Sequence, residues 1–84
     1  MKPATFKKML SGFNGVAGLY ELSEPLSEYN YVVVSATIAY SGPQTYIFGV
    51  DENGNVINWI ELPGSSRGVY CHKTALENAG YEEI

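Results

Sequence analysis

The segment formed by residues 29–40 constrains the fold more than any other part of the sequence. It contains the β-branched run Val32-Val33-Val34, followed by Thr37 and Ile38, and such side chains pack well on a pleated surface. Neither glycine nor proline interrupts it. Alternate residues from Asn30 onward form the more apolar of its two faces, which we expect to point at the core. The pattern predicts a long β-strand.

Two further strands are predicted at residues 45–50 and 55–62. The tetrapeptide between them, residues 51–54, is typical of a hairpin loop in which Gly54 or Asn53 supplies the left-handed residue. Residues 41–44 are predicted to form a turn, because Pro43 has no N–H to donate to a ladder. Residues 29–62 are therefore expected to form a three-stranded antiparallel meander.

The N-terminal part is less regular. In residues 3–10 the apolar side chains of Phe6, Met9 and Leu10 recur at helical spacing, which predicts a short helix. Residues 19–22 favour a short strand whose pairing partner the sequence leaves open.

The C-terminal part predicts a second helix over residues 69–79, which ends at Gly80. Together these elements predict one α+β domain covering residues 1–84. We expect an antiparallel three- to four-stranded β-meander with a C-terminal helix and a short N-terminal helix.

The charge balance limits the classes of partner. The chain has five Lys and Arg against nine Asp and Glu residues, so its formal net charge is −4. Such a chain is poorly suited to direct nucleic-acid binding, which needs basic groups to release counterions, and to docking on anionic membranes. The lone Cys71 excludes an internal disulfide, and we find neither a signal sequence nor a run of ~20 apolar residues. We expect a cytoplasmic protein.

One candidate ligand site lies where a glycine- and serine-containing loop leads into the C-terminal helix. Free N–H groups and the positive end of a helix attract anions at such a junction, and a guanidinium grips them in two places. This predicts binding of a phosphate, a nucleotide or another small anionic ligand. Alternatively, a serine only caps the helix and the arginine pairs with a surface acid. The residues concerned are Gly64, Ser65, Ser66, Arg67, Gly68, His72 and Lys73.

A second candidate is an aromatic patch on the sheet. Tyrosine and tryptophan are enriched where proteins bind one another, and two short helices do not easily cover both faces of a sheet. The patch would then contact a partner protein or a second copy of the chain. Alternatively, a helix covers it. Its members are Tyr29, Tyr31, Tyr46, Phe48 and Trp59.

Catalytic and metal chemistry finds little support. Cys71 and His72 are neighbours on the predicted helix, where adjacent side chains point about 100° apart and cannot act as nucleophile and base. The loop at residues 51–55 lacks the ligand set and the distal glutamate of a calcium-binding EF-hand. We predict no catalytic residue, metal or cofactor.

The C-terminal half resembles small uncharacterised proteins of bacteriophages. The resemblance covers residues 45–81 and is carried by Trp59-x-Glu61-Leu62, Gly64-Ser65-x-x-Gly68, His72-x-x-Ala75-Leu76 and Gly80-Tyr81. It implies a phage accessory protein that acts in the host cytoplasm by binding a host factor. The leading hypothesis is a non-enzymatic binding protein of the inhibitor or anti-defence type. The alternatives are a nucleotide- or phosphate-binding protein that uses residues 64–73, and a self-associating structural subunit.

Overall fold

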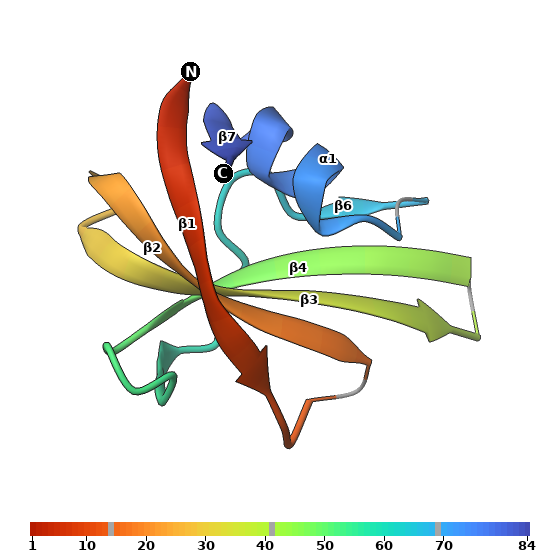
Figure 1. Ribbon diagram of the computed structural model, residues 1–84. Helices are drawn as coiled ribbons and strands as arrows, with labels where there is room; N and C mark the ends of the chain where they lie inside the picture. The colour runs from red at the N-terminus through yellow and green to blue at the C-terminus, as the bar shows by residue number, and fades with distance from the viewer. Residues whose placement is uncertain (14, 41, 69) are drawn as a thin grey trace.

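The computed structural model describes residues 1–13, 15–40, 42–68 and 70–84. Over these ranges the chain forms seven strands in one sheet and a single short helix (Figure 1). The strands are β1 (Lys2–Leu10), β2 (Val16–Leu26), β3 (Tyr29–Ala39), β4 (Gly42–Val50), β5 (Val56–Asn58), β6 (Ser66–Arg67) and β7 (Tyr81–Glu83), and the helix is α1 (His72–Asn78).

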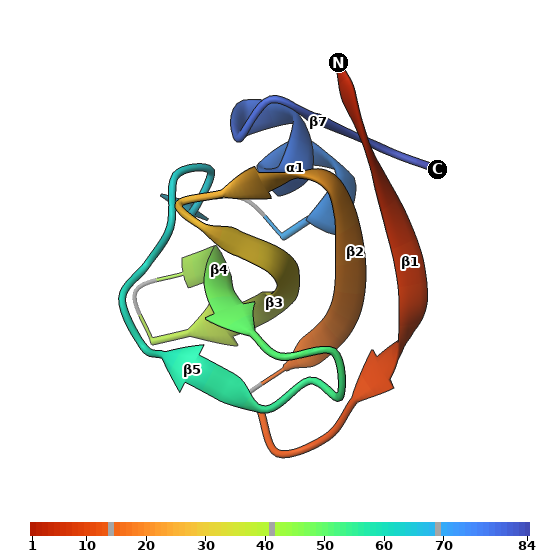
Figure 2. The ribbon, with the colours of Figure 1, turned by 90° about the vertical axis from the view of Figure 1, so that its left-hand side faces the viewer.

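The sheet is mixed. Its strand order is β5-β4-β3-β2-β1-β7, and β6 pairs with β4 beside this path. The neighbours are antiparallel except β7, which runs parallel to β1. Figure 2 shows that the sheet is curled rather than flat, with β1 and β2 bending around β3 and β4. The curl brings β5 near the turn between β1 and β2, where Leu10, Phe13 and Val56 pack on one apolar cluster.

Tight turns set the register of the long strands. Leu26 and Tyr29 face each other across the β2–β3 hairpin, and the two residues between them, Ser27 and Glu28, have φ values of 48° and 77°. Two consecutive left-handed residues match the right-handed twist of the strands that they join. In the β4–β5 loop, Gly54 takes the left-handed conformation predicted for it, with φ of 91°.

Both faces of the sheet are buried in part, because successive residues of β3 contribute to different clusters. Val32 and Val34 pack with Ile47, Leu76 and other side chains beneath α1. Val33, whose side chain points to the opposite face, packs with Ala17, Leu19 and Val50. This second face carries the cleft described below.

The predicted fold class is wrong. A single seven-stranded mixed sheet with one short helix replaces the three- to four-stranded meander with two helices. The predicted N-terminal helix over residues 3–10 is strand β1, which pairs with β2 along its length and with β7 at its start. A helix of about two turns is marginal on its own, whereas these ladders supply partners for the backbone of the whole segment.

Several predicted limits also shift. β2 is longer than the strand predicted at residues 19–22, and β4 already begins at Gly42, so that Pro43 lies in a strand rather than in a turn. β5 ends at Asn58, whose Oδ1 accepts a hydrogen bond from the N–H of Ile60. The predicted helix at residues 69–79 is shorter, from His72 to Asn78, and Gly80 follows it with φ of 93°. Of the predicted turn and helix, Ser41 and Val69 lie outside the described residues.

Candidate functional site

The loop predicted to bind an anion is used for packing at its start. The Cβ atom of any residue replacing Gly64 would lie 2.6 Å from the carbonyl oxygen of Ala75 in α1. The Oγ atom of Ser65 accepts a hydrogen bond of 2.9 Å from the N–H of Ile47 in β4. These residues therefore fasten the loop between β4 and α1.

The rest of the loop forms a short ladder. Ser66 and Arg67 make up β6 and pair with Thr45 and Gln44, and the N–H of Gly68 donates to the carbonyl of Pro43 over 2.7 Å. The hydroxyl of Ser66 is buried and forms no hydrogen bond within the described residues. Most of the loop's groups are thus directed at the sheet rather than gathered around a ligand.

The two basic residues predicted on the helix differ in their surroundings. His72 points at β2: its Nε2 lies 2.8 Å from the carbonyl oxygen of Val16, and its Nδ1 lies 3.2 Å from the hydroxyl oxygen of Tyr20. Lys73 is exposed on α1. With only seven residues, α1 is also too short to present a strong helix dipole.

A cleft of about 520 Å³ lies on the sheet face opposite α1. Strands β3 and β4 form its floor, the turn after β1 forms one wall, and the segment after β5 forms another. Its aromatic members are Phe13, Tyr46, Phe48 and Trp59, its polar members are Ser35, Thr37 and Gln44, and Gly12 and Ile38 complete it.

The four aromatic rings form a continuous series. Tyr46 and Phe48, two residues apart on β4, stack with their ring centroids 6.0 Å apart and their planes 22° apart. Trp59 meets Phe48 edge to face at 5.2 Å, and Phe13 meets Trp59 at 6.0 Å. Such arrangements are favourable for aromatic pairs. Trp59 nevertheless remains 66% exposed, so that a large apolar surface is left open to the solvent.

Polar groups continue the cleft along the strands. The hydroxyl of Tyr46 donates a hydrogen bond to Oε1 of Gln44. Thr37 lies directly across from Gln44 in the β3–β4 ladder, and Ser35 lies across from Tyr46. The cleft therefore changes along its length, from aromatic near Trp59 to polar near Gln44.

No family model matches the chain, and neither a curated protein nor a solved structure is similar to it at a significant level. The site must therefore be interpreted from its own chemistry.

Three residues of the predicted aromatic patch lie in the cleft, and two do not. Tyr46, Phe48 and Trp59 line it. Tyr29 lies over Gly49, in contact with the cluster beneath α1. Tyr31 packs against the second cluster, beyond the cleft lining.

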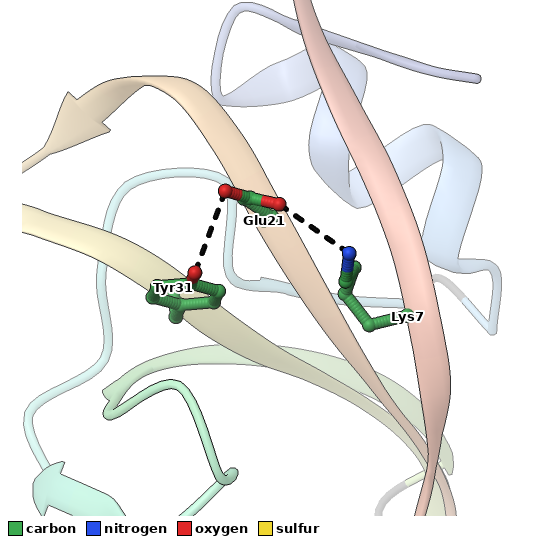
Figure 3. A network of polar contacts seen from close by, with 3 residues as sticks. All are labelled: Lys7, Glu21 and Tyr31. Carbon is green, nitrogen blue, oxygen red and sulfur yellow. Dashed lines mark hydrogen bonds and ion pairs between the residues drawn. The ribbon is translucent and has the colours of Figure 1, made fainter.

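Tyr31 belongs to a polar network that ties three strands together (Figure 3). Its hydroxyl donates to Oε2 of Glu21 over 3.4 Å, and Oε1 of the same carboxylate forms an ion pair with Nζ of Lys7 over 3.5 Å. Desolvation and the negative charge of Glu21 raise the pKa of the Tyr31 phenol, which therefore stays a neutral donor at physiological pH. The role of Tyr31 in the structure is to link β3 to β2.

The sequence interpretation missed Phe13 and the polar floor. Phe13 lies in the turn between β1 and β2, and an aromatic side chain at such a tip was the available signal. Thr37 and Gln44 could have been found by extending the alternation of the two strands toward their hairpin.

Two classes of feature are absent from the described ranges. No helix among the described residues is long and apolar enough to cross a membrane. Nor does any group of three or more His, Cys, Asp or Glu side chains in that part of the chain gather as ligands for a metal ion.

Proposed function

We propose that this chain is a small, non-enzymatic binding protein that holds a segment of a partner protein in the aromatic cleft. One observation carries the proposal: Trp59 packs edge to face against Phe48 at the wall of the cleft and yet stays 66% exposed. Burying an exposed indole ring releases a large apolar area from water, and tryptophan is among the residues most enriched at binding hot spots.

The nature of the cleft favours a partner protein. Its lining mixes four aromatic side chains with hydroxyl and amide groups and contains no charged residue. Interface cores share this composition, since they are depleted of charge and enriched in aromatic residues. The anion site predicted at residues 64–73 has less support, because Ser65 and His72 already bind Ile47, Val16 and Tyr20 within the fold.

The resemblance of residues 45–81 to phage proteins extends the proposal. It suggests that the chain acts in an infected cell and that the partner is a host protein whose action it inhibits. This part rests on the quoted motifs alone, and Trp59 is the one motif residue that also lines the cleft.

A matched pair of variants tests the function. Trp59→Ala removes the exposed indole, and Ile84→Ala removes a side chain of nearly equal exposure, 65%, that does not line the cleft. Immobilised wild type and Ile84→Ala should retain the same protein from a host lysate, and Trp59→Ala should lose it. A protein retained equally by all three, or a wild-type chain that only self-associates in solution through Trp59, would contradict the proposal.

A further inference from the structure

The position of Arg67 gives the cleft a charged end. Arg67 and Gln44 are partners in the antiparallel β6–β4 ladder, and such partners project their side chains to the same face of the sheet. Gln44 lines the cleft, so the exposed Arg67 stands at its rim. The ion pair found in the described part of the chain joins Lys7 to Glu21 and does not involve Arg67.

The aromatic and charged ends are separated by a definite length of strand. The rings of Phe13, Phe48 and Trp59 cluster at one end, and Gln44, four residues before Phe48 on β4, marks the other. Four residues of a strand span ~13 Å at about 3.3 Å per residue. A segment in polyproline II conformation advances about 3.1 Å per residue, so about four of its residues cover the same length.

The floor between these ends suits an extended backbone. A polyproline II segment forms no hydrogen bonds of its own and needs polar groups around it, and its rings dock between aromatic side chains. Thr37 and the Tyr46–Gln44 pair place hydroxyl and amide groups along the cleft. Ile38, which lines the cleft toward the β3–β4 hairpin, is itself 72% exposed and adds apolar surface there.

On these grounds we propose that the cleft selects an extended peptide segment in which a proline or aromatic ring lies about four residues from an aspartate or glutamate. The ring packs among Phe13, Phe48 and Trp59, and the carboxylate pairs with Arg67. The inference rests on the proposed function and specifies the chemistry of the partner. Arg67 is a local cation in a chain whose net charge is −4, and it sets the orientation of a bound acidic segment.

The test is a selection from a random dodecapeptide library on three immobilised proteins: wild type, Arg67→Glu and Trp59→Ala. Wild type should enrich a ring spaced about four residues from an acid. Peptides selected on Arg67→Glu should carry Lys or Arg in place of the acid and keep the ring. Peptides selected on Trp59→Ala should show no enrichment of a ring. Unchanged melting temperatures establish that the variants are folded.

Binding of one enriched peptide is then measured by the fluorescence of Trp59, the single tryptophan of the chain. Replacing its acid by the amide should weaken binding to wild type by about fivefold, as for a largely exposed ion pair, and leave binding to Arg67→Gln unchanged. Adenosine monophosphate, as a probe for a small anionic ligand, should not alter the fluorescence.

Three results would overturn the inference: enriched peptides without an acid at this spacing, no enrichment at all, or Arg67-dependent binding of the nucleotide. Its failure is distinguishable from failure of the proposed function. A host protein lost with Trp59→Ala but retained with Arg67→Glu would preserve the binding role and remove only the acidic-peptide specificity.

Discussion

The Nε2 atom of His72 lies 2.8 Å from the carbonyl oxygen of Val16 and fastens the first residue of α1 to strand β2. A carbonyl oxygen only accepts, so this ring nitrogen carries the hydrogen. On the other side of the ring, the hydroxyl of Tyr20 lies 3.2 Å from Nδ1 and donates to Glu83 in β7. Burial and the Glu83 carboxylate raise the pKa of the Tyr20 phenol, which keeps it a donor. His72 therefore acts as a structural link between β2 and α1.

Replacing His72 by alanine should lower the free energy of unfolding by about 1–3 kcal/mol, because the Val16 carbonyl and the Tyr20 hydroxyl both lose a partner. Urea denaturation followed by circular dichroism measures the change. Lys73→Ala, the next residue along and exposed, serves as the control and should leave the midpoint nearly unchanged. Equal stability of the two variants would contradict the structural role.

The β2–β3 turn carries strain that a substitution should relieve. Ser27 and Glu28 both have positive φ, a conformation that costs side chains other than those of Gly, Asn and Asp. The double change Ser27→Asn, Glu28→Gly matches the preferred pair for this turn and should stabilise the protein by about 1 kcal/mol.

Thermal unfolding of this double variant should show a higher melting temperature. The opposite pair, Ser27→Val and Glu28→Val, places β-branched residues at the same φ values and should lower it. If both double variants shift the melting temperature in the same direction, backbone strain at Ser27 and Glu28 does not determine the stability of the turn.

Cys71 should be a reactive thiol. It is exposed at the start of α1, and the hydroxyl and backbone N–H of Thr74 lower its pKa. A larger thiolate fraction at neutral pH follows, so alkylation by iodoacetamide should reach half its maximal rate at a lower pH than it does for an unperturbed thiol. Thr74→Val should move this midpoint upward, and an unchanged midpoint would refute the assigned cause.

The extent to which sequence predicts this fold depends on where the partners of each segment lie. β3 and β4 pair with each other along their length, so their alternation was enough to predict β3 and, from residue 45 onward, β4. β1 pairs at its start with β7, whose paired residues lie 79 positions further along, as from Lys2 to Tyr81, and no local pattern reports such a partner. A register shift between Phe6 and Lys8 also interrupts the alternation of β1 against β2, so the spacing of Phe6, Met9 and Leu10 favoured a helix.

The residues of the cleft could also be predicted only where a local pattern was sufficient. Tyr46 and Phe48 alternate on one strand, so their common face could be predicted, and Trp59 follows the returning strand. Tyr29 was assigned to that face by counting from Tyr31, but it packs over Gly49 on the helix side, next to the left-handed turn. Counting by two fails where such a turn or a register shift intervenes, as happens between β2 and β3.

Gly64 and Gly68 are both left-handed but differ in their packing, so a comparison of alanine variants distinguishes the effect of packing from that of backbone strain. Gly64 and Gly68 have φ values of 99° and 84°, so alanine at either position costs about 1 kcal/mol from the backbone alone. A Cβ at Gly68 meets nothing within 4 Å, whereas at Gly64 it meets Ala75, Ala79 and Ile47 at under 3 Å. Overpacking adds typically 1–3 kcal/mol.

Gly64→Ala should therefore be less stable than Gly68→Ala by about 1–3 kcal/mol in urea denaturation, the clash adding to a strain that both share. If Gly64 were instead a glycine that leaves space for a ligand, Gly64→Ala would weaken ligand binding. The stability of this variant would then equal that of Gly68→Ala. Equal denaturation midpoints for the two variants would thus support the anion site predicted at this loop. A lower midpoint for Gly64→Ala instead identifies the loop as the element that seats α1 on the sheet, on the face opposite the cleft for which we propose a partner.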